Sequence, residues 1–369
     1  MANNQFKLPP VSPLIGSTLR VFNKTLKGNH IDPQFKTKKN ITAAIIYLIS
    51  PFRWFERAFV LPRARKQNPA EVVFIIGHWR GGTTFLHNLM CQAANASFVT
   101  TYQTVFPNFM GSKWLFRAVM KAIMPDKRPS DNVKLSVDFP QEEEFAFSGA
   151  NPHSYYRYMY FPKNYQEYYD EATQQKGLNN EEKEAFIGNY KDILHKALLN
   201  KPGEILIIKN PVNTARIKML HREYPNAKWI HIYRNPYTVF KSTLKFFKQL
   251  LPTLWFESVS DEFIEKMILN TYVRLYRDYD IALKDIPDLH LVELKFEDFE
   301  QDPIGNLKSI YEKLGLSDFE KSRDRFELYI KSQKSYQKNK YEMSQEMIAL
   351  VNAHWGEYVE RWGYEVPGR

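Results

Sequence analysis

Four short apolar runs, each followed by a longer segment of helical pattern, most constrain how this chain folds. The runs cover residues 71–77, 204–209, 228–233 and 290–296. The helical segments that follow them cover residues 83–93, 214–223, 237–248 and 303–314. Runs of this length, rich in β-branched and aliphatic residues, are typical of strands buried on both faces of a parallel sheet, whose strands are joined by crossover helices. The pattern therefore predicts an α/β fold with a parallel β-sheet flanked by helices.

Two segments lie outside this alternation. Residues 1–70 start with a polar, proline-rich arm and continue into an apolar stretch, and the long insert at about 101–202 is rich in Tyr, Phe and acidic residues. We expect an N-terminal arm with an amphipathic helix over residues 1–70 and one α/β domain over residues 71–369. Within that domain the mainly helical insert is the natural place for substrate-binding elements and a lid.

Charge and cysteine content limit the partners and the compartment. The 51 basic residues exceed the 41 acidic ones, which favours an anionic partner: a nucleotide, an acidic substrate, nucleic acid or a membrane surface. We find no nucleic-acid-binding module in the sequence and expect no nucleic-acid partner. Cys91 is the only cysteine, and the first residues lack the pattern of a secretory signal, so we expect a cytoplasmic protein. Oligomeric state is not encoded in any pattern that we recognise.

The segment over residues 41–66 has two interpretations. It is too often interrupted by Pro51 and charged residues to span a bilayer. Its aromatic and aliphatic residues are flanked by basic ones, so it is either a helix packed on the core or a helix that lies in a membrane interface and gives peripheral membrane contact.

The first apolar run leads into a turn that suits a phosphate group. The sequence VVFIIGHWRGGTTFLHNL combines a buried strand, a glycine-containing turn and a helix start, which aims backbone N–H groups and the positive helix end at an anion. It resembles the nucleoside-triphosphate loop GxxxxGK[ST] from Gly77 to Gly82, but Thr83 stands where the lysine belongs.

The sequence differs from that of nucleoside-triphosphate-binding proteins at a second position. At the end of the third run, Arg234 stands in place of the acidic residue with which a kinase or ATPase holds magnesium. An arginine offers a planar fork of donors to phosphate and repels a metal ion. These two positions disfavour a nucleotide kinase or NTPase and predict a nucleotide site that requires no metal.

Together these residues resemble the family of PAPS-dependent sulfotransferases, in their bacterial and cytosolic forms. PAPS is 3′-phosphoadenosine 5′-phosphosulfate. The family's 5′-phosphosulfate loop corresponds here to Arg80-Gly81-Gly82-Thr83-Thr84-Phe85, and its 3′-phosphate motif corresponds to Arg234-Asn235-Pro236 with Ser242. Residues 294–303 are similar to a later family segment, with Phe296 where a tyrosine often lies near the adenine. The resemblance covers roughly residues 71–364 and implies a P-loop-like fold.

The resemblance also implies roles for the residues. Arg80 and the amides of Gly82, Thr83 and Thr84 would hold the 5′-phosphate, with Arg80 also offsetting charge as the sulfur–oxygen bond breaks. The 3′-phosphate would be held by Arg234 and by the Ser242 hydroxyl. A basic segment at about 334–340 either adds to this contact or is a solvated charge run. Phe85 and Phe296 either border the adenine or pack in the core. Lys209 either donates to the sulfuryl oxygens or is a surface lysine.

The general base is the least defined part of the site. In related bacterial sequences a KxPxH pattern supplies a histidine, but here the pattern ends at Asn213, which is no base. The best replacement is the acidic run FPQEEEFAF, in which Glu142, Glu143 and Glu144 lie between aromatic residues. The alternative for this run is a solvated start of a helix. His78 and His153 are reserve candidates.

The resemblance therefore predicts an enzyme, a sulfotransferase, that moves a sulfuryl group from PAPS to a small-molecule hydroxyl acceptor by in-line attack assisted by a base. The product would be adenosine 3′,5′-bisphosphate. The aromatic content of the insert favours a hydrophobic alcohol such as a sterol or lipid. Two alternatives stay open: a carbohydrate sulfotransferase, and a non-catalytic protein that binds PAPS or another nucleotide.

Overall fold

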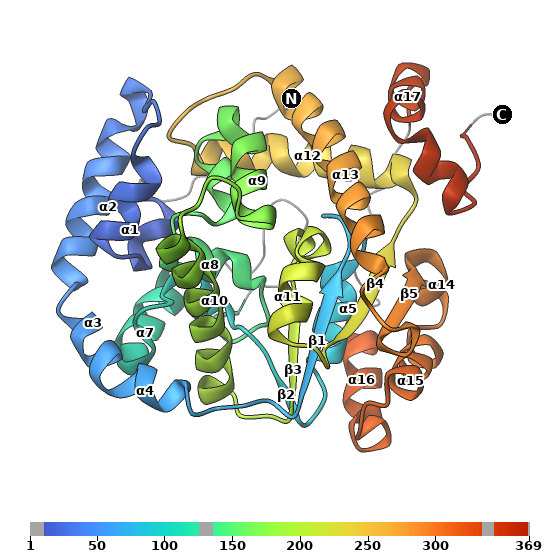
Figure 1. The fold of residues 1–369 in the computed structure, drawn as a ribbon, viewed down its shortest axis with the longest axis horizontal. Helices are drawn as coiled ribbons and strands as arrows, with labels where there is room; N and C mark the ends of the chain where they lie inside the picture. The colour runs from blue at the N-terminus through green and yellow to red at the C-terminus, as the bar shows by residue number, and fades with distance from the viewer. Residues whose placement is uncertain (1–10, 125–135, 334–342, 368–369) are drawn as a thin grey trace. The chain divides into compact units, whose positions relative to one another are not determined.

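The strands of the computed structural model form a parallel sheet in the order β2-β3-β1-β4-β5 (Figure 1). The strands are β1 (Glu71–Ile76), β2 (Ala96–Ser97), β3 (Ile205–Lys209), β4 (Lys228–Tyr233) and β5 (Leu291–Lys295). The structure describes residues 11–124, 136–333 and 343–367. The predicted α/β class, with a parallel sheet flanked by helices, is confirmed.

The chain divides into two compact units, which we describe separately. The first unit comprises residues 1–70, 95–208 and 249–259, and the second comprises residues 71–94, 209–248 and 260–369. The long insert and the N-terminal segment thus belong to one unit, and most of the strand–helix alternation belongs to the other.

The second unit contains β1, β4 and β5 in parallel register. Ile76 of β1 lies opposite His231 of β4, and Tyr233 of β4 lies opposite Lys295 of β5. The carboxyl ends of these strands therefore meet at one edge of the sheet, where ligands bind in open α/β sheets.

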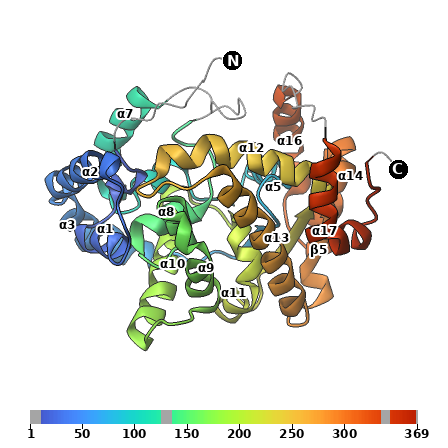
Figure 2. The same cartoon turned by 90° about the horizontal axis from the view of Figure 1, so that it is seen from above.

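The helices of the second unit follow the strands, as their sequence predicts. They are α5 (Thr83–Met90), η7 (Pro211–Ala215), α11 (Ile217–Glu223), α12 (Pro236–Leu254, which runs on into the first unit), α13 (Asp261–Leu283), η8 (Asp288–His290), α14 (Phe296–Gln301), α15 (Pro303–Leu314), α16 (Phe319–Gln333) and α17 (Gln345–Arg361). Helix α17 packs on α13 (Figure 2): the buried Trp355 stacks on Tyr272 at 3.7 Å between ring centroids, and its indole N–H donates to the Leu269 carbonyl at 3.1 Å.

The first unit is mainly helical. It contains η1 (Pro13–Gly16), α1 (Leu19–Leu26), η2 (Pro33–Phe35), α2 (Lys36–Ile49), α3 (Phe52–Phe55), the π-helix η3 (Glu56–Val60), α4 (Leu61–Ala64), α6 (Thr101–Val105), η4 (Met110–Ser112), α7 (Lys113–Ile123), α8 (Glu143–Ala150), η5 (Tyr155–Met159), η6 (Pro162–Asn164), α9 (Tyr165–Gln174) and α10 (Asn180–Asn200). It also contains β2 and nearly all of β3.

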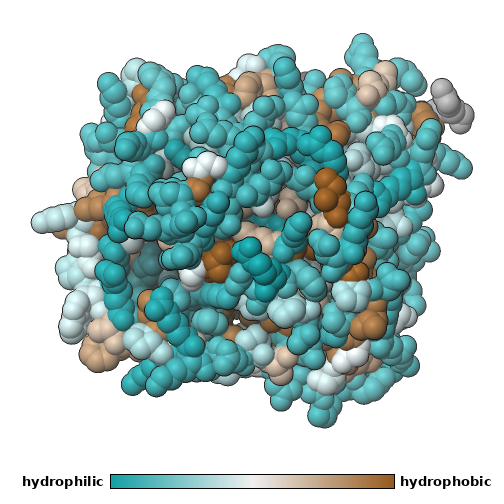
Figure 3. All heavy atoms as spheres, viewed as in Figure 1, coloured by the Kyte–Doolittle hydropathy of each residue, from teal (hydrophilic) through white to brown (hydrophobic). Residues whose placement is uncertain are grey.

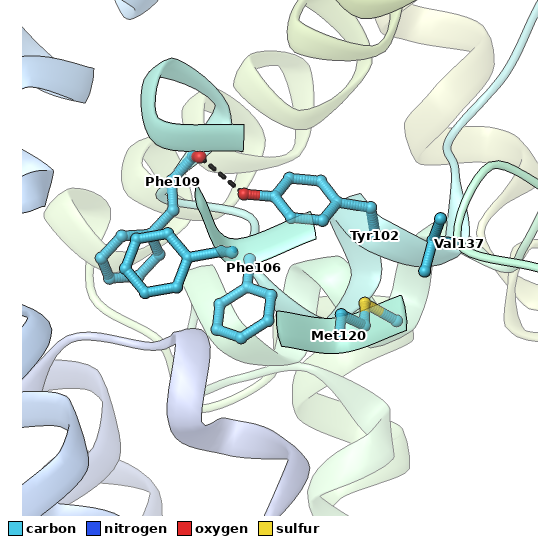
Figure 4. Packing of buried hydrophobic residues seen from close by; sticks show 6 residues of the cluster. Tyr102, Phe106, Phe109, Met120 and Val137 are labelled. Carbon is cyan, nitrogen blue, oxygen red and sulfur yellow. Dashed lines mark hydrogen bonds between the residues drawn. The ribbon is translucent and has the colours of Figure 1, made fainter. Parts of the chain in front are cut away.

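An aromatic cluster forms one core of the first unit (Figure 4). The figure shows Tyr102 of α6 together with Phe106, which follows that helix, and Phe109; the Tyr102 hydroxyl donates to the Phe109 carbonyl at 2.8 Å. Met120 of α7 and Val137 pack against the same group. Aromatic residues that the sequence suggested for an acceptor site are therefore, in part, structural core.

Candidate active site

The turn between β1 and α5 has an unusual backbone. Gly77, Arg80 and Gly82 have φ values of 136°, 65° and 98°, all in a region that side-chain-bearing residues rarely adopt. The two glycines also lie against other atoms: a Cβ would collide with the Ile232 carbonyl at Gly77 and with the Phe296 ring at Gly82. Glycine is therefore required at both positions.

This turn leads directly into the amino end of α5. Gly82 is the N-cap residue, and its carbonyl accepts hydrogen bonds from Phe85 N at 3.1 Å and Leu86 N at 3.3 Å. The first N–H groups of a helix have no partner within the helix and carry its partial positive charge. Gly82, Thr83 and Thr84 thus contribute backbone donors where the sequence predicts a 5′-phosphate.

Arg80 lies against the second turn of α12. Its Nε donates to the Ser242 hydroxyl at 2.9 Å, and its guanidinium lies 5.2 Å from the centre of the Phe246 ring. Ser242 is 4% exposed. The 5′-loop arginine and the 3′-motif serine, 162 residues apart in sequence, are therefore in direct contact.

Arg234 follows the end of β4 and approaches the same turn. One of its terminal nitrogens lies 3.5 Å from the Arg80 carbonyl, and its guanidinium lies 4.3 Å from the centre of the Phe296 ring. The next residue, Asn235, caps α12 through its side-chain oxygen, which accepts from Tyr237 N at 3.0 Å and Thr238 N at 3.2 Å. The RNP motif thus positions a cation and starts a helix.

Lys209, the last residue of β3, reaches the first turn of α5. It is 2% exposed, and its Nζ donates to the Thr84 hydroxyl at 3.3 Å. Lys209 thus adds a cationic side chain at the first turn of α5, where a charge-assisted hydrogen bond suits an anion.

The segment after Lys209 supports the turn. The Thr214 hydroxyl accepts from Gly77 N at 2.8 Å, and the side chain of Asn210 accepts from Val212 N at 3.0 Å. Asn213 is fully buried. Sequence reasoning missed Thr214 and Phe246; the only signal for Phe246 was its spacing of four residues from Ser242 on one helix.

The two predicted adenine contacts have different surroundings. Phe85 packs against Phe299 at 5.3 Å and Tyr329 at 6.3 Å between ring centroids, which favours the core-packing alternative for Phe85. Phe296 starts α14 beside Gly82 and Arg234, so its ring borders the Arg234 guanidinium.

The acidic run belongs to the first unit and starts α8. Glu144 is fully buried, and its Oε1 accepts from the Ser154 hydroxyl at 2.7 Å and from Tyr155 N at 2.9 Å. Glu143 is 1% exposed and accepts from the Tyr190 hydroxyl at 2.7 Å. Glu142, the N-cap residue, is half-buried and accepts from the Tyr156 hydroxyl. The run is therefore not a solvated helix start.

The reserve histidines have structural surroundings. Burial lowers the pKa of His78 to about 4, its Nδ1 lies 2.8 Å from the Trp79 carbonyl, and its ring lies 4.9 Å from that of Tyr272. In the first unit His153 lies 2.9 Å from a carboxylate oxygen of Glu171.

Two further predictions concern the basic segment at about 334–340 and a site that requires no metal. The basic segment lies outside the described residues. Across residues 11–124, 136–333 and 343–367, no group of three or more His, Cys, Asp or Glu side chains could hold a metal ion.

Comparison with known proteins defines the family. The model of the sulfotransferase family matches residues 72–321. This match covers more than half of the chain, so the protein belongs to the sulfotransferase family and is a transferase.

Two curated relatives and two solved structures agree. The omega-hydroxy-beta-dihydromenaquinone-9 sulfotransferases Stf3 of Mycobacterium bovis and Mycobacterium tuberculosis are each 33% identical over 294 residues, which cover 79% of this chain and 75% of the relative. Sulfotransferase STF9 from Mycobacterium avium has a TM-score of 0.67 at 16% identity, covering 96% of this chain and 98% of that one. Sulfotransferase STF1 from Mycobacterium tuberculosis H37Rv has a TM-score of 0.64 at 17% identity, covering 91% and 90%. At these identities the structural likeness shows the fold.

Proposed function

We propose that this protein transfers a sulfuryl group from PAPS to the hydroxyl of a hydrophobic alcohol of the sterol or lipid type. One observation carries the proposal for the donor: Arg80, Ser242 and Arg234 meet at the amino end of α5. A nucleotide with phosphates at both its 5′ and 3′ positions matches two arginines, a hydroxyl donor and a row of helix amides.

In this proposal the residues of the chain have distinct roles in donor binding and catalysis. PAPS supplies the activated sulfuryl group. Arg80 and the amides of Gly82, Thr83 and Thr84 hold the 5′-phosphate, and Arg80 stabilises the negative charge that grows there as the bond to sulfur breaks. Arg234 and Ser242 hold the 3′-phosphate, and Lys209 donates to the sulfuryl oxygens.

For the general base we propose Glu142. Among the three glutamates it is the half-buried one, and Glu143 and Glu144 are fully enclosed with hydrogen bonds that tie α8 to its neighbours. A carboxylate that takes the acceptor's proton must be able to reach that hydroxyl. The acceptor oxygen then bonds to sulfur while the 5′-phosphate leaves as part of adenosine 3′,5′-bisphosphate.

The class of acceptor rests on the relatives. The Stf3 proteins carry a name that denotes a hydroxylated menaquinone as their acceptor, and a lipid alcohol is the corresponding substrate class here. We also propose that the protein works in the cytoplasm and contacts membranes peripherally through residues 41–66. None of the helices over the described ranges is long and apolar enough to cross a bilayer.

Calorimetry tests the donor site. We expect adenosine 3′,5′-bisphosphate to bind the wild-type protein far more tightly than ATP with magnesium. Arg234→Ala should weaken bisphosphate binding by at least about tenfold, since a charge-assisted contact is worth roughly 1.5–3 kcal/mol. The matched control is Arg222→Ala: Arg222 is an exposed arginine of the same unit that pairs with Glu223.

Two results would oppose the proposal. A preference for ATP with magnesium would favour a kinase-like activity. Tight bisphosphate binding without turnover on any sterol, lipid alcohol or carbohydrate would instead favour the non-catalytic alternative.

A further inference from the structure

Large apolar side chains are exposed on neighbouring elements of the first unit. The most exposed of them are Tyr47, Leu48 and Trp54 on α2 and α3, at 67%, 71% and 69%, and Trp114 on α7, at 77%. Phe55 and Phe59 add aromatic area at 45% and 44%. We call these six residues the apolar surface. Figure 3 shows brown and pale side chains along the edge where Figure 1 draws α2, α3 and α4.

The apolar surface is not the inward face of a loosely attached helix. In α2 the inward positions are Lys38, Thr42 and Ile46, spaced four residues apart and buried. Tyr47 and Leu48 lie on the other side of the same helix and are exposed, so α2 presents large apolar side chains to solvent that its packing on the unit does not use.

A buried ion pair holds the aromatic part of this surface in place. Glu56 and Lys196 are 4% and 5% exposed, and their charged atoms lie 3.4 Å apart. Glu56 also accepts from Gly111 N at 2.9 Å. The neighbours of Glu56 along the chain, Phe55 and Arg57, are exposed, so the buried carboxylate fixes a short helical segment whose other side chains point to solvent.

Helix α7 belongs to the same surface. Phe52 of α3 contacts Phe116 of α7 edge to face, with 5.3 Å between ring centroids, and both Figures 1 and 2 draw α7 beside the α2–α4 segment. Phe116 also packs on Phe106 at 5.2 Å, within the aromatic cluster of Figure 4. The exposed aromatic residues are therefore continuous with the aromatic core of this unit.

Basic residues outnumber acidic ones along the segments that carry the apolar surface, although Lys38 points inward and is buried. Residues 36–66 contain eight basic residues and one acidic residue, the buried Glu56: the basic ones are Lys36, Lys38, Lys39, Arg53, Arg57, Arg63, Arg65 and Lys66. Helix α7 adds Lys113, Arg117 and Lys121 and contains no acid. Some of these cations have acidic partners on the protein, as Arg65 has in Asp192 and Arg117 in Asp138.

We infer that the apolar surface docks on an anionic lipid bilayer, with its aromatic and aliphatic side chains among the acyl chains and the surrounding lysines and arginines at the lipid phosphates. Exposed Trp, Tyr, Phe and Leu rimmed by Lys and Arg is the composition of segments that lie in a membrane interface. A second copy of this chain fits the surface poorly, because a symmetric contact would bring the two basic rims together.

Docking on a bilayer would bring the protein to the membrane in which the proposed lipid acceptor dissolves, and in that respect the inference rests on the proposed function. A hydrophobic alcohol is concentrated in bilayers, so an enzyme held at the bilayer surface meets its acceptor there. Membrane binding itself is measured without sulfuryl transfer, so the membrane inference and the proposed sulfuryl transfer fail separately.

Flotation of the full chain with vesicles tests the inference. We expect the protein to float with vesicles of phosphatidylcholine and phosphatidylglycerol and to float weakly with phosphatidylcholine alone. The triple variant Leu48→Ser, Trp54→Ser, Trp114→Ser should bind the anionic vesicles at least about tenfold more weakly. The matched control is Ile281→Ser, Leu289→Ser, Leu328→Ser, which replaces side chains of the second unit that are 61%, 63% and 69% exposed.

Bisphosphate binding by calorimetry reports whether each variant is folded and keeps its donor site. The inference is wrong if the wild-type protein does not float with anionic vesicles, or if the surface variant floats as well as the control. It is also wrong if the wild-type protein is a dimer by light scattering and the surface variant is a monomer, since the surface would then be covered by protein. Failure of bisphosphate binding in the wild type would overturn the proposed function and leave the membrane inference standing.

Discussion

At the scale of single residues, the turn between β1 and α5 depends on backbone conformations that ordinary side chains avoid. Arg80 adopts φ 65° although it carries a side chain, which costs on the order of 1–2 kcal/mol. The contacts of its guanidinium with Ser242 and Phe246 hold it in this conformation. Backbone strain of this kind is concentrated at ligand-binding sites.

Gly82→Ala tests this dependence. A Cβ at residue 82 would meet the Phe296 ring, and φ is 98° there, so we expect the turn to shift and bisphosphate binding to weaken by at least about tenfold. The control is Gly315→Ala, where φ is 64° and no atom lies within 4 Å of the added Cβ. That variant should lose about 1 kcal/mol of stability and keep its affinity for the bisphosphate. Equal affinities for the two variants would contradict the prediction.

Lys38 predicts a pH dependence of stability. Burial lowers its pKa from 10.5 to about 8, and its Nζ donates to the carbonyls of Thr253 at 2.8 Å and Trp255 at 3.1 Å. Between pH 8 and 10.5 the unfolded chain binds a proton here that the folded chain has released, so unfolding becomes harder as pH rises. A shift of this size corresponds to roughly 3 kcal/mol.

Urea unfolding of the wild type and Lys38→Met isolates this effect, because all other groups titrate alike in both proteins. The free energy of unfolding of the wild type, relative to the variant, should rise between about pH 7.5 and about pH 10. A relative stability that stays constant or falls over this range would show that the folded protein keeps Lys38 protonated.

At the scale of elements, the start of α8 places three adjacent carboxylates in different surroundings. Glu142→Gln should lower turnover by about 10²–10⁴-fold without changing bisphosphate affinity, since it removes the proposed general base. Glu144→Gln should instead cost about 1–3 kcal/mol of stability, because Ser154 and Tyr155 lose a charged acceptor. Steady-state kinetics and thermal unfolding of both variants separate these outcomes. Full turnover in Glu142→Gln would remove that residue from the mechanism.

Elements were predicted well where the sequence pattern is strong. The four predicted strands are β1, β3, β4 and β5, because strands buried in a parallel sheet are continuous apolar runs. Strand β2 was missed, since Ala96 and Ser97 form a run too short to have a period. The helix expected over residues 214–223 starts instead as the 3₁₀ turn η7 from Pro211 and continues as α11.

The candidate site was predictable where motifs are local and unpredictable where support comes from distant residues. Arg80 and Arg234 were found because each belongs to a contiguous motif, and the fold brings the two together. Thr214 reaches Gly77 across 137 residues of sequence, and no local pattern indicates that contact. The three glutamates look alike in sequence and differ only in burial and hydrogen-bond partners, which the folded chain alone defines.

At the scale of the whole molecule, the formal net charge of +10 makes association with anionic surfaces dependent on salt. The electrostatic attraction is screened over about 10 Å at 0.1 M ionic strength and about 3 Å at 1 M. Burial of apolar side chains in a bilayer is not weakened by salt in this way. The two contributions to membrane binding can therefore be separated by ionic strength.

We expect the preference for anionic over neutral vesicles to shrink by at least about tenfold between about 0.1 M and about 1 M sodium chloride, with residual binding through the apolar surface. Arg57→Glu should weaken binding at low salt and have little effect at high salt, whereas Trp54→Ser should weaken binding at both, because Arg57 acts through charge and Trp54 through buried area. Flotation of the wild type and of both variants at the two salt concentrations measures these effects. If Trp54→Ser lost its effect at high salt, the tryptophan would lie outside the acyl region, and the contact would be electrostatic throughout.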